Sequence, residues 1–112
     1  LLVKASTRDT GGGAINSNVA VQFNGSATGL SLREVYGTSS STGSASLSNM
    51  RIGYTAGSTA TASTFGSGEI YISNYTSSNY KSSSAEGVSE SNAVGVYSAL
   101  EANLWANTSA IT

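Results

Sequence analysis

The stretch Thr64-Phe65-Gly66-Ser67-Gly68-Glu69-Ile70-Tyr71-Ile72-Ser73-Asn74-Tyr75 decides the fold class of this chain. Its β-branched and aromatic residues are preceded by glycines and followed by a polar run, which is typical of a strand bounded by turns. Side chains alternate between the two faces of a strand, so Ile70 and Ile72 share one face. The opposite face carries Glu69 and Tyr71. One apolar and one polar face predict an antiparallel sheet with one side against a core.

Alternation of the same kind predicts further strands on both sides of this stretch. Val19, Val21 and Phe23, for example, occupy every second position and should share one face. The predicted strands cover residues 1–8, 18–24, 30–36 and 49–54 on the N-terminal side and 80–90 on the C-terminal side.

Two of these strands depart from simple alternation. Val35 breaks the phase of 30–36, which predicts a β-bulge at that point. The segment 80–90 is polar throughout, and its charges predict a position at the edge of a sheet, where charge discourages pairing with another sheet.

Glycine, asparagine and hydroxyl residues predict the connections. Asn24-Gly25 favours a tight turn of the hairpin type. The segments 37–46 and 56–63 consist almost entirely of small residues and predict exposed loops. The segment 107–109 should turn the chain, and 110–112 resembles the first residues of another strand.

The segment 92–105 fits two structures. Tyr97, Leu100 and Leu104 have helical spacing in an alanine-rich stretch. The alternative is a strand through 97–100 followed by another through 102–105. We favour strands because the neighbouring segments are all predicted to be β.

Together these elements predict an all-β fold, an antiparallel β-sandwich or jelly-roll-like arrangement of about six to eight short strands with long Ser/Gly-rich loops. The length of 112 residues predicts a single domain over 1–112. Both ends stop inside a strand-like pattern, so we expect a fragment that lacks terminal strands.

The composition limits the classes of function. The net charge is −1, with 5 basic and 6 acidic residues, which gives no basic surface for nucleic acid. The chain has no cysteine or histidine, so thiolate and imidazole metal sites are excluded and no cofactor is expected. No apolar run is long enough to span a membrane, and no charged start leads into an apolar run as in a signal peptide.

The apolar core should be small. Leu, Ile, Val, Phe, Met, Trp and Tyr number 29, against 35 Ser and Thr. A partner surface could therefore supply part of the burial that stabilises the fold. The sequence predicts a homo-oligomer or a chain that assembles with other proteins.

Catalytic candidates are few. Glu69, Glu86 and Glu90 form the one plausible carboxylate group, and a glycosidase needs two carboxylates about 5–9 Å apart. Glu86 and Glu90 are about 13 Å apart along one strand, so only a pair that includes Glu69 could fit. We favour the simpler explanation that they are solvated charges on a strand face, and we predict no enzyme activity. Asp9 beside glycines is a weak calcium candidate.

Aromatic side chains are the better candidates for a contact site. Tyr71, Tyr75, Tyr80 and Trp105 could contact a protein surface or stack on a sugar. The alternative for Trp105 is a core position with its indole N–H hydrogen-bonded, and for Tyr71 it is plain exposure.

Several motifs carry a family resemblance over nearly the whole chain. They are V-x-F-N-G at 21–25, V-Y-G at 35–37, M-R-I-G at 50–53, T-F-G-x-x-E-I-Y-I-x-N-Y at 64–75 and L-W-x-N-T-x-A-I-T at 104–112. They resemble short Ser/Thr/Gly-rich virion-associated proteins of tailed, often marine, bacteriophages. The motifs are structural and include no active-site residues.

The resemblance implies a non-enzymatic virion structural or decoration protein that assembles with itself or with other virion proteins. Its expected location is the extracellular particle, assembled in the host cytoplasm. An alternative is a carbohydrate- or receptor-binding module of a tail appendage, with a host surface glycan as its ligand. Neither nucleic acid nor a membrane is an expected partner.

Overall fold

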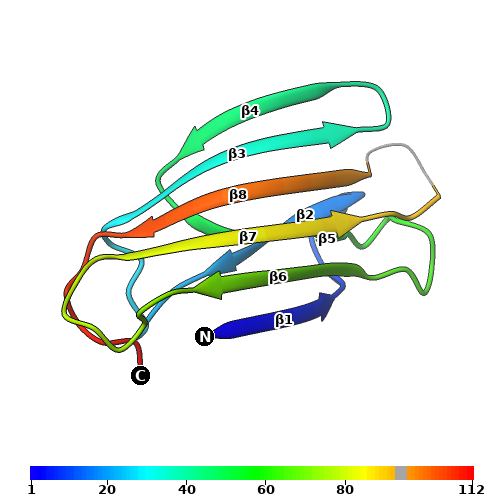
Figure 1. The fold of residues 1–112 in the computed structure, drawn as a ribbon. Coiled ribbons are helices and arrows are strands. Elements are labelled where there is room, and N and C mark those ends of the chain that lie inside the picture. Colours follow the sequence, from blue (N-terminus) through cyan, green and yellow to red (C-terminus); the bar gives the residue numbers. More distant parts are fainter. Residues whose placement is uncertain (93–95) are drawn as a thin grey trace.

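The computed structural model of the chain describes residues 1–92 and 96–112, and these residues form eight strands in two antiparallel sheets. A six-stranded sheet has the order β1-β6-β7-β8-β3-β4, and a two-stranded sheet pairs β2 with β5 (Figure 1). The strands are β1 (Leu2–Thr7), β2 (Asn16–Val21), β3 (Leu30–Thr38), β4 (Thr42–Leu47), β5 (Met50–Ala56), β6 (Gly66–Ile72), β7 (Lys81–Ser89) and β8 (Tyr97–Trp105). The predicted antiparallel β-sandwich is confirmed.

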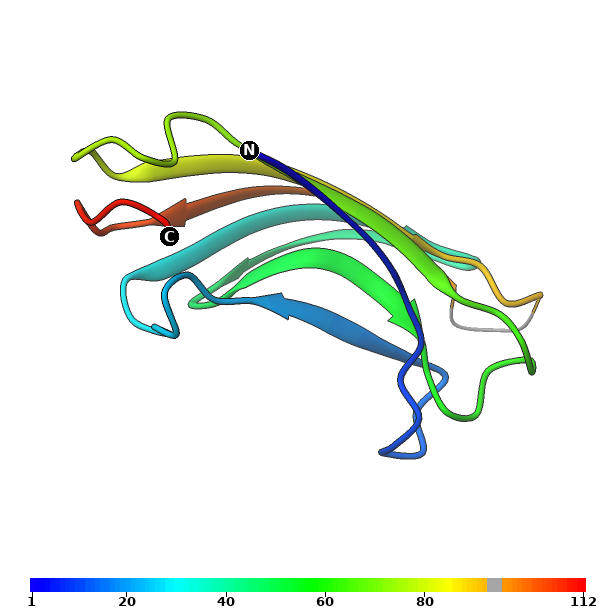
Figure 2. The same ribbon diagram turned by 90° about the horizontal axis from the view of Figure 1, so that it is seen from below.

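The small sheet stands with β5 next to the six-stranded sheet and β2 on the far side of β5 (Figure 2). Six of the seven residues of β5 are therefore buried, whereas β2 keeps exposed positions. Met50 and Ile52 pack against Ile70, Ile72 and Trp105 in the apolar core. The stretch 64–75 thus supplies one wall of the core, with Ile70 and Ile72 inward as predicted.

Glycines allow β5 to pass directly over β7 and β6. A Cβ atom on Gly53 would lie 2.6 Å from the Cα atom of Gly87, and one on Gly68 would lie 2.4 Å from the carbonyl oxygen of Ile52. Gly53 also has φ +80°, a conformation that side chains disfavour. The two sheets approach closely because these positions have no side chain.

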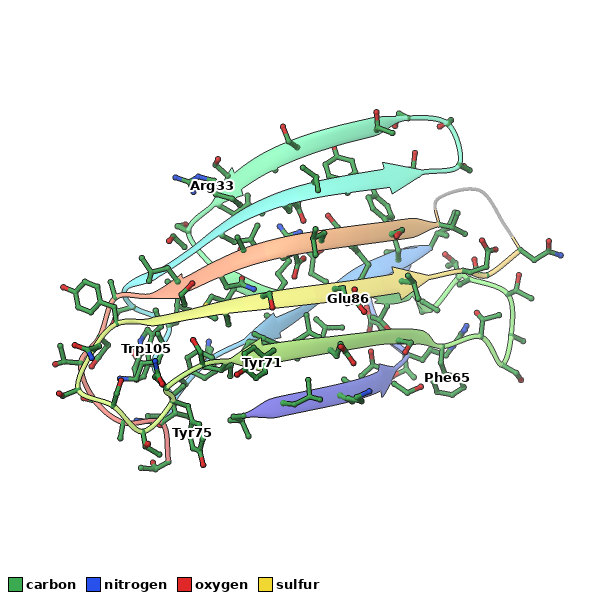
Figure 3. The ribbon with its side chains drawn as sticks, in the orientation of Figure 1. Arg33, Phe65, Tyr71, Tyr75, Glu86 and Trp105 are labelled. Atoms are coloured by element: carbon green, nitrogen blue, oxygen red, sulfur yellow. The ribbon has the colours of Figure 1, made fainter. Side chains whose placement is uncertain are left out.

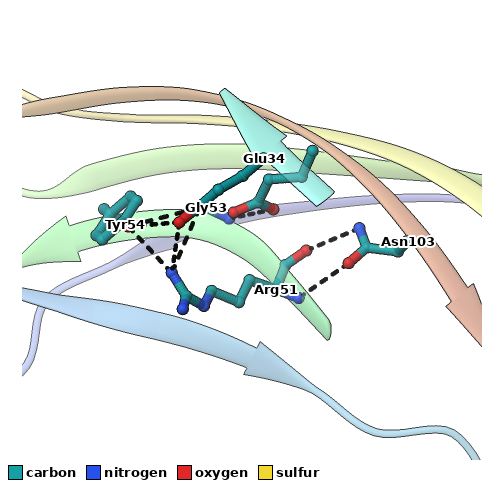
Figure 4. A network of polar contacts seen from close by, with 6 residues as sticks. Glu34, Arg51, Gly53, Tyr54 and Asn103 are labelled. Atoms are coloured by element: carbon teal, nitrogen blue, oxygen red, sulfur yellow. Dashed lines mark hydrogen bonds and ion pairs between the residues drawn. The ribbon is translucent and has the colours of Figure 1, made fainter. Parts of the chain in front are cut away.

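Two side chains of β8 form hydrogen bonds with backbone groups of β5, on the edge of β5 that does not pair with β2 (Figure 4). The backbone N–H of Arg51 donates to Oδ1 of Asn103 at 3.3 Å, and Nδ2 of Asn103 donates to the carbonyl oxygen of Arg51 at 3.3 Å. The N–H of Gly53 donates to Oε2 of Glu101 at 3.0 Å. A buried ion pair of 3.4 Å between Arg51 and Glu34 lies beside this contact.

Two cations hold the connections at the ends of the strands. Nζ of Lys81, a fully buried residue, lies 2.5–3.4 Å from the carbonyl oxygens of Ser77, Asn79, Asn107 and Ser109. The guanidinium of Arg8 donates to four carbonyls of the β5–β6 connection, those of residues 58, 60, 61 and 64. In both cases a charged group takes the place of the water that would otherwise solvate loop carbonyls.

The prediction of a loop over 37–46 is wrong, because β4 occupies 42–47 and pairs with β3 along its whole length. The strand lies at the edge of the six-stranded sheet and carries only small side chains apart from Leu47. Its stability comes from backbone hydrogen bonds, which leave almost no trace in hydropathy.

The predicted edge position of 80–90 is also wrong, since β7 lies between β6 and β8. Its inward side chains, apart from Lys81, are small because β5 crosses immediately above them. Its outward side chains face solvent. Close packing on one side and water on the other explain the polar composition.

The bulge predicted at Val35 is absent from β3, whose pairing with β8 is continuous. Alternation is kept because Glu34 is the inward residue, buried by its ion pair with Arg51, and Val35 faces out. A shift of register occurs instead in β2, between Asn18 and Ala20.

Asn24-Gly25 forms a turn with φ values of 51° and 70°, as predicted, but it connects strands of different sheets. The predicted strands within 92–105 form one continuous strand, β8, and residues 93–95 of that segment lie outside the described residues. The segment 110–112 forms no strand. Instead the N–H of Ile111 donates to the carbonyl oxygen of Tyr75 at 2.8 Å.

Candidate functional site

The surface with the strongest functional features is the outer face, defined as the side chains of the six-stranded sheet that point away from β5. Alternation in six paired strands brings them to one side of the molecule. Among the strands of the described chain, none covers this face (Figure 2).

Aliphatic side chains form the middle of the outer face. Val35 of β3 is directly opposite Leu100 of β8, and each is 57% exposed. Val88 of β7 is 49% exposed nearby, and Ala102 follows Leu100 on the same face of β8. A sheet face open to solvent normally carries polar residues at such positions. The apolar strip is therefore a feature that the fold itself does not require.

Charged side chains flank this strip on two sides, and Figure 3 labels two of them, Arg33 and Glu86. Lys4 and Glu69 form an exposed ion pair of 3.0 Å, and Glu86 is directly opposite Glu69 across β6 and β7. Glu86 has no hydrogen-bond or ion-pair partner among the described residues. On the other side, the one hydrogen bond that Arg33 donates within the described residues is to the adjacent carbonyl oxygen of Leu32, at 3.0 Å.

Two shallow, open depressions lie on the outer face. The larger extends over all six strands, from Lys4 and Glu69 across Leu100 and Val35 to Thr42. The other adjoins it over β7, β8, β3 and β4, and Arg33 and Ala102 are among its lining residues.

The structure brings Glu69 and Glu86 together, as the sequence required for a carboxylate pair, but on an open face. Hydrolysis of a glycoside needs one carboxyl group with a raised pKa. Burial raises the pKa of Glu101, and this carboxyl lies on the opposite side of the sheet against β5. The carboxyl group with the raised pKa and the pair of carboxylates therefore lie on opposite faces of the sheet.

Oxygen ligands for a metal are equally dispersed. Asp9 accepts hydrogen bonds from the N–H of Gly11 at 2.9 Å and from Oγ of Ser17 at 2.6 Å, and the Ser17 contact is the larger cause that lowers the pKa of this carboxyl. Within residues 1–92 and 96–112 no three acidic residues are grouped to hold an ion, and no helix could cross a membrane.

The predicted aromatic contact residues lie apart. Tyr71 is on the outer face and 55% exposed, while Tyr75 and Tyr80 are exposed in the β6–β7 connection. None of the three lines either depression. Trp105 is buried in the core, 5.4 Å from the ring of Phe23, so it cannot contact a partner. Its Nε1 has no hydrogen-bond partner within the described part of the chain, contrary to the paired indole expected for a core position.

Sequence reasoning missed two groups of residues. The rings of Tyr54 and Tyr97 stack with their centroids 4.2 Å apart, and the centroids of Tyr36 and Tyr97 are 5.8 Å apart. The three rings form an aromatic cluster beside the Arg51–Glu34 pair. It also missed that Arg33 and Glu86 lie on either side of β8, which depends on the registers of β3, β8 and β7.

The geometry thus offers an open sheet face with an apolar strip and flanking charges as the candidate site. Comparisons of the chain with protein-family models, with curated proteins and with solved structures give no significant match.

Proposed function

We propose that this chain is a non-enzymatic structural or decoration module of a phage particle and that it joins the particle through the outer face. The observation that carries the proposal is the apolar strip of Val35, Leu100 and Val88 on a sheet face that no strand of the described chain covers. The phage setting rests on the resemblance described for the sequence.

The energetics favour contact with protein at this face. Complete burial of a Val or Leu side chain stabilises a contact by about 1.5–3 kcal/mol, so covering these half-exposed side chains contributes about 1 kcal/mol each. Contiguous exposed apolar surface is a mark of interaction sites in soluble proteins. The adjacent charges add specificity for orientation.

Co-sedimentation tests the proposal. The chain is produced together with the proteins of the genes that flank its own, and assembled particles are separated on a density gradient. We expect the chain in the particle fractions and expect Leu100→Asp to remove it, because the new carboxylate would be buried at the contact.

The matched control is Ile15→Asp, which changes an exposed apolar residue away from the outer face and should leave the chain with the particles. A wild-type chain that stays at the top of the gradient would contradict the proposal.

The exposure of Tyr71 and Tyr80, 55% and 61%, supports a second candidate, a glycan-binding module of a tail appendage. A glycan array checks it. Binding that Tyr71→Ala or Tyr80→Ala abolishes would support this function, and an array without binding by the wild-type chain would remove it.

A further inference from the structure

We infer that the outer face pairs with the outer face of a second copy of this chain about a two-fold axis, with Glu86 of each copy over Arg33 of the other. This inference rests on the proposed assembly function and names a second copy of the chain as the partner that the outer face contacts in the particle. Charge complementarity across the apolar strip is its basis.

Strand register fixes where the two charges lie. Glu86 is opposite Leu100, and Arg33 is opposite Ala102, two residues further along β8. With strands about 4.8 Å apart and about 3.4 Å per residue, the Cα atoms of Glu86 and Arg33 are about 12 Å apart. Their midpoint is on β8 between Leu100 and Ala102, within the apolar strip.

A two-fold axis through this midpoint, in the plane of the face and perpendicular to the line between the charges, exchanges the positions of Glu86 and Arg33. A two-fold interface requires such self-complementarity, because each contact occurs twice. The axis places β8 over the β8 of the second copy, so that apolar residues meet apolar residues. Both unpaired charges then gain a partner.

The shape of the face agrees with this axis. Figure 2 shows that the strands bow away from the small sheet, so the outer face is convex along the strands. The larger depression, which runs from Lys4 to Thr42, shows that the face is hollow across them. Two such saddle-shaped faces fit when their strands cross at a steep angle, as in orthogonal sheet packing. The axis defined by the charges gives a steep crossing.

The dimensions of the molecule leave room for a specific dimer. The two larger dimensions of the molecule, 43 and 25 Å, bound a face of 43 by 25 Å, or about 1,100 Å². A stable interface of standard size buries about 800 Å² of each partner.

Charge reversal tests the inference. The mass of the chain is measured by analytical ultracentrifugation at low ionic strength over a wide range of concentration. We expect a concentration-dependent dimer for the wild type, and a dissociation constant at least about tenfold higher for Glu86→Arg and for Arg33→Glu, since each reversal opposes like charges.

An equimolar mixture of the two reversed variants should restore the dimer. In that heterodimer the arginine introduced at position 86 of one copy faces the glutamate introduced at position 33 of the other, and the unchanged Glu86 and Arg33 form the second contact. Circular dichroism checks that each variant is folded. Ile15→Arg, which adds a charge at an exposed position away from the outer face, is the control and should leave the dissociation constant unchanged.

A folded wild-type chain that stays monomeric, a dimer that both reversals leave intact, or a mixture that stays monomeric would each overturn the inference. Co-sedimentation with particles is a separate measurement. A monomeric chain that still joins particles overturns the self-pairing alone, whereas a dimer that never joins particles overturns the proposed particle role and leaves the pairing.

Discussion

Lys81 shows how one residue organises a large part of this chain. Its ammonium group lies below the surface, 5.7 Å from the ring centroid of Trp105, and contacts four carbonyl oxygens, two from the β6–β7 connection and two from the segment after β8. No carboxylate is among these partners. A buried cation is tolerated when several hydrogen-bond acceptors replace its hydration shell.

Replacement of Lys81 by Met should therefore destabilise the protein by about 3 kcal/mol, because the four carbonyls lose the charged donor that they share. Urea unfolding of the wild type and the variant measures the difference. Lys4→Met is the matched control, since Lys4 forms an exposed ion pair that contributes less than about 1 kcal/mol. Equal losses for the two variants would contradict this role of Lys81.

Glu101 should make the stability depend on pH. Burial raises the pKa of its carboxyl, the hydrogen bond from Gly53 opposes that shift, and the charge of Glu34 adds to it. The folded state then binds the proton more tightly than the unfolded chain. The resulting stabilisation is complete below the unfolded pKa of about 4.3 and is lost as the pH rises through the folded value.

Glu101→Gln should remove this loss, because the amide stays neutral and its oxygen can still accept from Gly53. We expect the variant to gain stability relative to the wild type between pH 4 and pH 8, measured by denaturant unfolding at each pH. Glu90→Gln, at an exposed site, should follow the wild-type profile. Parallel profiles for Glu101→Gln and the wild type would show that the raised pKa is wrong.

At the scale of elements, the crossing of β5 over β7 depends on the absence of side chains. A Cβ atom on Gly87 would lie 2.7 Å from the carbonyl oxygen of Ile52 and 2.8 Å from the Cα atom of Gly53. Both neighbours are backbone atoms of a strand held on its other side by β2, so neither can move alone.

Gly87→Ala should therefore lower the free energy of unfolding by about 3 kcal/mol through overpacking. Gly37→Ala is the matched control, because a Cβ atom at Gly37 meets nothing within 4 Å. It should leave the stability unchanged or slightly higher. Thermal unfolding of both variants compares them, and a stable Gly87→Ala protein would refute the close-packing explanation.

The sequence predicts an element well when one face of a strand is strongly apolar. Ile70 and Ile72 made β6 evident, whereas β4 alternates Gly43 and Ala45 with hydroxyl residues, a difference in hydropathy too small to see. The central position of β7 was hidden for a related reason. Its inward side chains, apart from Lys81, are small because the backbone of β5 crosses directly above them. This contact depends on the tertiary structure and leaves no pattern in the sequence.

The candidate site was less accessible to sequence reasoning than the fold. The exposure of Tyr71 followed from alternation alone. The apolar strip and its flanking charges required the strand order, because Arg33 of β3 is distant in the chain from Glu86 of β7 and Leu100 of β8. The role of Trp105 was ambiguous in the sequence, since an aromatic residue suits a core and a contact surface equally.

At the scale of the whole molecule, the sheet order requires contacts between distant parts of the chain. β1 pairs with β6 and β3 pairs with β8, so loops of more than fifty residues must close before these pairs form. Folding of such a topology is slow, in the range of milliseconds to seconds. The chain contains no proline and no cysteine, so proline isomerisation and disulfide exchange cannot add a slower step.

We therefore expect refolding at concentrations where the chain is monomeric to follow a single exponential, measured by stopped-flow fluorescence of Trp105. The rate should not depend on how long the chain has been kept unfolded. A second phase of tens of seconds that grows with the time spent in denaturant would contradict this expectation.

The way in which Arg8 and Lys81 hold the connections also has a consequence for sequence divergence. Both cations bind mainly main-chain oxygens, which every amino acid provides. Substitutions among the loop residues can therefore accumulate without disturbing these contacts of Arg8 and Lys81. Such a scaffold allows its loops to diversify rapidly while two basic residues, seventy-three positions apart, stay the same.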